Sequence, residues 1–138
     1  MFRFTLVFWL LPFLSIAPIH DVDFSNVINI YAVSATVYNA EESQCNYDYL
    51  TTACNSKIDL SIVNELRWVA LSRDLLARWG GEFNYHDTIH VISNDERISG
   101  KWVVKDCMNS RFTNKLDFLQ CKFTGIYDKW DSIKILKL

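Results

Sequence analysis

The chain has 138 residues, enough for one domain with a hydrophobic core but not for two. Fourteen basic and 16 acidic residues give a formal net charge of −2. No cluster of lysine and arginine marks a nucleic-acid-binding face, so the composition argues against a nucleic-acid partner.

The first 17 residues, MFRFTLVFWLLPFLSIA, contain one basic residue followed by an apolar run that ends in small residues. This pattern is typical of a secretory signal peptide. The run is shorter than the ~20 residues of a membrane span, and Pro12 interrupts it. We therefore expect cleavage, no stable membrane insertion afterwards, and a secreted or periplasmic location, with a retained membrane anchor as the alternative.

Residues 18–30 are polar enough to be a linker, and the rest of the chain, 31–138, is expected to form the domain. The first half predicts a strand in VINIYAVSATVY, a long loop over residues 39–59 and a buried strand in ELRWVALS. RDLLARWGG predicts a short helix that buries Leu75, Leu76 and Trp79 on one face and stops at the two glycines.

The second half predicts strands in TIHVIS and GKWVVKD, joined as a hairpin, and further strands in NKLDFLQ and SIKILKL. In the last of these, Ile133 and Ile135 alternate with polar residues. Short strands with one short helix and long loops predict an all-β fold, a small closed barrel of six strands.

Four cysteines, at positions 45, 54, 107 and 121, follow the leader. An even number in an exported chain predicts two disulfides, although three pairings are possible. Zinc is the competing use, but no pair has the spacing of two to four residues that zinc ribbons use. His86 and His90 are four residues apart in a segment that runs from loop into strand, where this spacing does not converge on a metal. We therefore expect no metal and no cofactor.

Asp106 and Asp117 are the residues that raise a question about chemistry. They are eleven residues apart, and each follows a short apolar run. An aspartate at the end of a strand most often caps a turn, so a simple hairpin is the first interpretation. An active site is the second, and the wider sequence bears on the choice.

The order ATVYNA, TTACNSKID, RWVALSRDLL, VVKDCMNSRFTNKLDFL and WDSIKILKL resembles the 3D domain, named for its three aspartates. This small double-psi β-barrel occurs in membrane-bound lytic transglycosylase A and in muralytic proteins of sporulating bacteria. It is related more distantly to the rare lipoprotein A, barwin and expansin families. The resemblance spans residues 31–138. Thr52 and Ala53 match a family turn, and Asp106 and Asp117 match the second and third aspartates at the family's own spacing.

The chain departs from the family pattern at several positions. Ser72 stands where the first aspartate is expected, and Asp74 lies two residues further on. Met108 and Asn109 replace paired glycines. Cys54 and Cys107 replace residues that flank the cleft of the family, so a bridge between them is one disulfide pairing to consider. Local pairing, 45 with 54 and 107 with 121, is the rival.

The resemblance implies a lytic transglycosylase that cleaves the β-1,4 bond between N-acetylmuramic acid and N-acetylglucosamine in peptidoglycan. One carboxyl group can serve as acid and then as base. Asp117 would be that group, and Asp106 would hold a loop or raise the proton affinity of Asp117. Thr52, Ser72 and Asn109 would contact substrate. We expect a monomer.

Two further readings stay open at this point. The first is a non-catalytic carbohydrate-binding barrel of the expansin or lipoprotein A kind, and the second is a barwin-type protein that binds another protein. Lys101, Lys105 and Arg111 are candidates for the wall of a polysaccharide groove or for a solvated face. The tryptophans at positions 68, 79, 102 and 130 are expected mostly in the core, with sugar stacking as the alternative.

Overall fold

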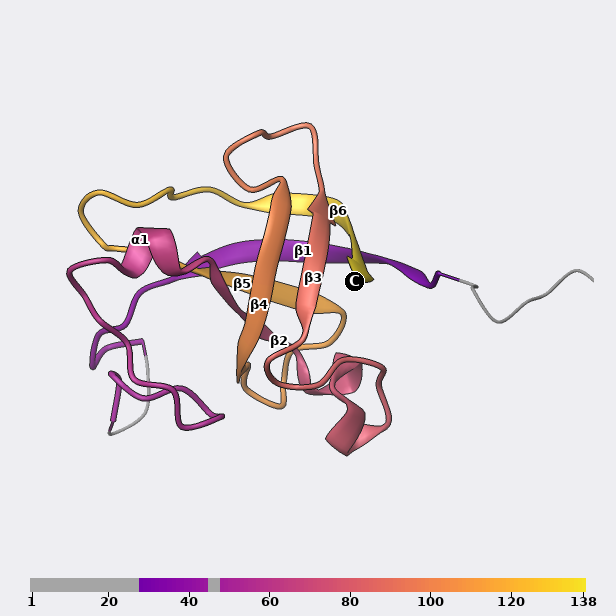
Figure 1. Cartoon of the computed structure of the whole chain (residues 1–138), viewed down its shortest axis with the longest axis horizontal. Helices are drawn as coiled ribbons and strands as arrows, with labels where there is room; N and C mark the ends of the chain where they lie inside the picture. Colours follow the sequence, from indigo (N-terminus) through magenta and orange to yellow (C-terminus); the bar gives the residue numbers. More distant parts are fainter. Residues whose placement is uncertain (1–27, 45–47) are drawn as a thin grey trace, which may run out of the picture.

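The structure, a computed structural model, describes residues 28–44 and 48–138 and contains a closed barrel in the strand order β1-β5-β2-β4-β3-β6 (Figure 1). The predicted leader and most of the predicted linker lie outside these residues. The strands are β1 (Ile30–Tyr38), β2 (Trp68–Leu71), β3 (Thr88–Ile92), β4 (Gly100–Cys107), β5 (Lys115–Leu119) and β6 (Trp130–Lys137). The helical elements are α1 (Val63–Leu66) and the 3₁₀ helices η2 (Arg73–Leu75) and η3 (Ala77–Trp79).

The strand pairing is mixed. β1 pairs in parallel with β5, and β2 pairs in parallel with β4. β2 and β5 are antiparallel, β3 is antiparallel to both β4 and β6, and the β1–β6 pair closes the barrel. In Figure 1, β3 and β4 cross in front of β1, β5 and β6. The expected fold class, an all-β six-stranded barrel with one short helix and long loops, is confirmed, and the two parallel pairs agree with a double-psi arrangement.

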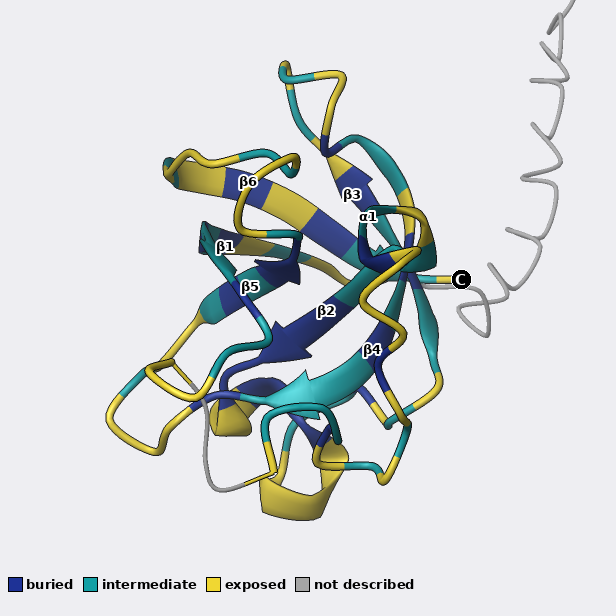
Figure 2. Cartoon of the chain, turned by 90° about the vertical axis from the view of Figure 1, so that its left-hand side faces the viewer, coloured by how far each residue is buried: buried dark blue, intermediate teal, exposed yellow. Residues whose placement is uncertain are grey.

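The barrel interior is filled by one face of each strand, because side chains alternate along a strand. β5 turns Leu116 and Phe118 inward, and β6 turns Ile133 and Ile135 inward, as the alternation in the sequence predicts. The ring of Phe118 lies 4.5 Å from that of Trp102, centroid to centroid. Figure 2 shows β2 buried along most of its length. The residues of β2 and β5 that alternate with these core residues point out of the barrel, where they can contribute to a functional site.

The segment after β2 differs from the prediction. Leu76 has extended backbone angles, φ −89° and ψ 135°, and divides the segment into two 3₁₀ turns where one helix was expected. Leu75 and Leu76 are buried, but Trp79 is 40% exposed, so the prediction that it shares their buried face is wrong. The break at Leu76 removes the helical spacing on which that prediction depended. Gly80 ends η3 with φ 96°, a left-handed conformation that glycine adopts without strain.

Within the described ranges, no helix is long and apolar enough to cross a membrane.

The hairpin between β3 and β4 is present as predicted. α1 was not expected as a helix, because four residues are too few to show a helical period. β1 begins at Ile30, one residue before the expected start of the domain.

Candidate functional site

Asp106 and Asp117 do not belong to one hairpin, because β2 lies between β4 and β5. Ala70 on β2 is in register with both aspartates, and Thr36 on β1 is in register with Asp117. Register partners point to the same face of a sheet, so Thr36, Asp117, Ala70 and Asp106 form one row across four adjacent strands. With strands ~4.8 Å apart, the Cα atoms of the two aspartates are separated by about 10 Å.

An irregularity in β4 places Asp106 on this row. Val104 pairs with Val69 inside the barrel, whereas the next residue of β2, Ala70, pairs with Asp106 and so skips Lys105. Without the extra residue, strict alternation would turn Asp106 inward behind Val104. Bulges of this kind re-aim side chains and are common beside functional sites. The small Ala70 side chain then leaves space between the two carboxyl groups.

Ala70, Asp106 and Asp117 of this row line a cleft with a volume of about 410 Å³. The size falls within the ~300–1,000 Å³ usual for ligand sites. The described residues that line the cleft are Tyr38, Gln44, Asp48, Tyr49, Thr51, Thr52, Ala53, Ala70, Arg73, Asp106, Cys107, Met108, Asn109, Arg111, Phe112 and Asp117. Both carboxyl groups therefore face a space large enough for a ligand.

Both oxygens of Asp106 accept hydrogen bonds from its surroundings. Oδ1 accepts from the backbone N–H groups of Ala53 and Cys107, each at 2.9 Å, and Oδ2 accepts from the Tyr38 hydroxyl at 3.2 Å. Burial raises the pKa of Asp106, and these three donors act against that rise. Asp106 thus fastens the loop that carries Ala53 to the end of β4.

Asp117 has fewer partners. Its Oδ1 accepts a hydrogen bond from the Thr36 hydroxyl, and its Oδ2 has no hydrogen bond with any residue that the structure describes. Burial raises the pKa of Asp117, opposed by the Thr36 hydroxyl and the Lys115 charge. Repulsion by Asp106 is not among the causes of this pKa shift. The shift therefore does not support the expectation that Asp106 raises the proton affinity of Asp117. The site therefore supplies a carboxyl group with a raised pKa and one oxygen that no described residue binds.

The three predicted substrate contacts fall in different places. Thr52 is buried at the wall of the cleft, and its hydroxyl lies 3.3 Å from Cys54 Sγ. Asn109 is exposed at the cleft and accepts a hydrogen bond from Arg111 N. Ser72 is fully buried and does not line the cleft; its Oγ accepts from Lys115 N at 2.9 Å. The structure brings Thr52 and Asn109 to the aspartates and keeps Ser72 away.

Asp74, the nearest acid to the missing first aspartate, does not reach the cleft. Its Oδ2 accepts a hydrogen bond from Asn114 N at 2.9 Å, which ties η2 to the loop before β5. The carboxyl groups of the cleft are those of Asp48, Asp106 and Asp117 among the described residues, and that of Asp48 forms an ion pair with Lys57 at 3.3 Å.

The expected disulfides are not present among the cysteines that the structure describes. Cys54, Cys107 and Cys121 are free in the structure, so neither the 54–107 nor the 107–121 bridge is present. Two disulfides would need all four cysteines, and the expected pair of disulfides is therefore not found. Cys45 lies outside the described residues. The Sγ of Cys54 contacts the hydroxyls of Thr52 and Ser56, each at 3.3 Å.

Sequence reasoning missed Thr36, Tyr38, Arg73 and Phe112 at this site. Thr36 and Tyr38 alternate with core residues on β1, but only the parallel pairing of β1 with β5 brings them to the aspartates. Of the three basic residues considered, Arg111 lines the cleft and Lys101 and Lys105 do not.

The remaining candidates lie elsewhere. His86 is in a turn where Lys105 Nζ approaches its Nδ1 at 2.8 Å, and His90 is in β3. Trp102 is buried in the core as expected, and the tryptophans at positions 68, 79, 102 and 130 are not among the cleft residues.

No model of a known protein family matches the chain, and a search of curated proteins gives no significant match.

Proposed function

We propose that this protein is a secreted, lytic transglycosylase-like enzyme that acts on peptidoglycan, with Asp117 as its acid and base. The environment of Asp117 carries the proposal. Its carboxyl group is partly buried, has a raised pKa and lines a cleft of about 410 Å³, and its Oδ2 accepts no hydrogen bond from the described residues. A general acid needs a proton at the working pH and access to the substrate; the raised pKa of Asp117 and its position at the cleft support this role.

The reaction requires one carboxyl group. Protonated Asp117 donates its proton to the glycosidic oxygen as the bond from that oxygen to muramyl C1 breaks. The muramyl C6 hydroxyl oxygen then bonds to C1, and its proton passes to the Asp117 carboxylate, which restores the acid. Thr36 holds Oδ1 of Asp117, so Oδ2 is the oxygen directed to the substrate. The products are a free N-acetylglucosamine hydroxyl and a 1,6-anhydromuramyl end, with no water consumed.

Asp106 is assigned a positioning role, because its carboxylate is held by three donors. It fixes the turn of Thr52 and Ala53, which forms one wall of the cleft. This is the loop-holding role that the resemblance to the 3D domain implies. The second implied role, tuning of Asp117 by charge, is not needed.

Export is part of the proposal, since peptidoglycan lies outside the cytoplasmic membrane. The predicted leader over residues 1–17 supplies the route. N-terminal sequencing of protein from the culture medium tests it. We expect a chain that starts near residue 18, whereas an intact Met1 in a membrane fraction would favour the retained anchor.

Mass spectrometry of peptidoglycan digested with the purified full chain tests the activity. We expect 1,6-anhydromuropeptides from the wild type and from Asp131→Asn, a control that changes an exposed aspartate on β6. Asp117→Asn should release almost none. Reducing muropeptides would indicate hydrolysis by water, and the absence of any product from the wild type would overturn the enzyme proposal.

A non-catalytic binding barrel is the second candidate, and the burial of Ser72 favours it. Ser72 stands in place of the first aspartate of the 3D domain and does not line the cleft, so only two of the three aspartates are matched at this site. Tyr49 and Phe112 at the cleft are suited to stacking on sugar rings. Co-sedimentation with insoluble peptidoglycan, without product release and unchanged in Asp117→Asn, would support this candidate.

A further inference from the structure

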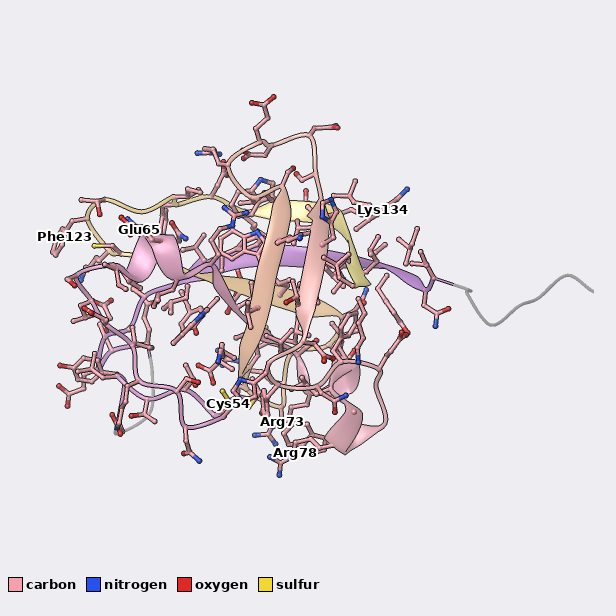
Figure 3. The ribbon with its side chains drawn as sticks, viewed as in Figure 1. Cys54, Glu65, Arg73, Arg78, Phe123 and Lys134 are labelled. Carbon is pink, nitrogen blue, oxygen red and sulfur yellow. The ribbon has the colours of Figure 1, made fainter. Side chains whose placement is uncertain are left out.

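Two arginines lie on one side of the cleft. Arg73 belongs to η2 and Arg111 to the loop between β4 and β5, and both line the cleft. The two segments are held together, because Ser72 N donates to Lys115 O and Asn114 N donates to Asp74 Oδ2, each at 2.9 Å. The arginines are thus carried by one connected part of the cleft wall. Arg73 and its neighbour Arg78 are labelled in Figure 3.

Each of these arginines rests on an aromatic ring. The guanidinium carbon of Arg73 is 5.0 Å from the Trp79 ring centroid, and that of Arg111 is 4.7 Å from the Phe112 ring centroid. Stacking of this kind restricts the guanidinium group and leaves the N–H groups at its edge free. An arginine held in this way is prepared for a planar anionic group, such as a carboxylate, or for a phosphate.

Neither arginine has an acidic partner in the described ranges. No ion pair involves Arg73 or Arg111 there, although Arg97 on the β3–β4 turn is paired with Asp95 at 2.6 Å and Asp128 at 3.0 Å. Among the acids that line the cleft, Asp106 is held by three donors and Asp48 pairs with Lys57, while Asp117 forms no ion pair with either arginine. Two unpaired positive charges therefore face the space where a ligand would lie.

We infer that Arg73 and Arg111 bind an anionic group carried by the polymer in the cleft, so that the substrate class is an acidic glycan and not a neutral one. The inference rests on the proposed function for the identity of the cleft as a glycan site. The shared chemistry is an anionic oxygen group, which a glycan supplies as a carboxylate on its sugars and a cell-wall phosphodiester polymer supplies as a phosphate.

Calorimetric binding to three probes tests the inference in an Asp117→Asn background, which prevents turnover. The probes are peptide-free murein glycan strands with lactyl carboxylates, chitin oligosaccharides of matched length without charge, and poly(glycerol phosphate). Arg73→Gln and Arg111→Gln should each weaken binding of the murein strands about two- to fivefold, the range for exposed ion pairs, and the double variant up to about 25-fold. Binding of the chitin oligosaccharides should not change.

Arg78→Gln is the matched control, because Arg78 also lies over the Trp79 ring, at 4.3 Å, but does not line the cleft. It should leave all affinities unchanged. Equal losses for chitin and murein strands, or no loss for any anionic probe, would overturn the inference even if the enzyme releases anhydro products. Arginine-dependent binding of poly(glycerol phosphate) alone would support the anion site with phosphate as its ligand and would contradict the peptidoglycan proposal.

Discussion

Asp106 and Asp117 lie on opposite sides of Ala70 in the same row of the barrel, and burial raises the pKa of both. Their surroundings nevertheless differ. Asp106 accepts hydrogen bonds from two backbone N–H groups and from Tyr38, whereas Asp117 accepts one from Thr36 and keeps Oδ2 free of the described residues. Asp106 on β4 therefore binds the loop that carries Ala53, whereas Asp117 on β5 binds no loop among the described residues.

A raised pKa alone therefore does not identify an acid catalyst. A carboxyl group that must protonate a substrate needs an oxygen that no protein group already occupies. Asp106 fails that condition and Asp117 meets it. The two residues should therefore respond differently to the same substitutions, and the difference can be measured.

The largest effect is expected from Asp117→Asn. The amide keeps the size of the side chain but cannot supply the proton, so the rate of anhydro-product release should fall ~10²–10⁴-fold, the usual contribution of general acid–base catalysis. Asp106→Asn keeps an oxygen for Ala53 N and Cys107 N and should lose less. Initial rates, with circular dichroism as a check on folding, decide between them. Equal losses of rate in the two variants would contradict the different roles assigned to Asp106 and Asp117.

Stability should show the opposite order. Asp106→Ala leaves the N–H groups of Ala53 and Cys107 and the Tyr38 hydroxyl without their acceptor, and the free energy of unfolding should fall by about 2 kcal/mol. Asp117→Ala removes one side-chain hydrogen bond and should cost less. Urea unfolding of both variants measures this. A larger loss in Asp117→Ala would contradict a structural role for Asp106.

Asp117→Asn should be more thermally stable than the wild type near neutral pH. The folded pKa of Asp117 is raised above that of the unfolded chain, near ~3.9, so the folded protein binds the proton more tightly. The stability that Asp117 contributes is therefore present at low pH and is lost as pH rises through the folded pKa. Melting curves should show a gain in Tm at pH 7 that shrinks towards pH 3. A gain independent of pH would mean that ionisation is not its cause.

The smallest effect is expected from Thr36→Val, which keeps the shape of the side chain but removes the hydroxyl donor. That hydroxyl favours the ionised form of Asp117, so its loss should raise the pKa of Asp117 further. Turnover at the optimal pH should change by about fivefold or less, the value of one hydrogen bond. Carboxyl-carbon NMR titration of Asp117 measures the shift, and a lower pKa would contradict the proposed role of Thr36.

Much of the barrel follows from the sequence because its signals are local. The alternation of Ile133 and Ile135, and the β-branched residues of VINIYAVSATVY, predict strands from neighbours two residues apart. The segment with Leu76 was harder, because its apolar spacing suits a helix, whereas the chain turns there in two 3₁₀ steps. The helical spacing therefore predicts Trp79 in the core, whereas the structure exposes it.

The candidate site depends on contacts that no local pattern encodes. Asp106 and Asp117 stand out by type and spacing, but their separation by β2 and their common register with Ala70 follow from the order of strands in the closed barrel. The bulge at Lys105 has no signal in the sequence. Thr36 meets Asp117 only through the pairing of β1 with β5, which are far apart in the chain.

The pH dependence of anhydro-product release by the wild type and by Asp106→Asn tests the central claim most directly. Asp117 must be protonated to act, so activity should fall as pH rises through its raised pKa. Because burial and not repulsion from Asp106 causes the rise, Asp106→Asn should keep this falling limb at nearly the same pH. Activity that increases with pH through this region, or a limb that disappears in Asp106→Asn, would contradict the assignment of Asp117 as the acid.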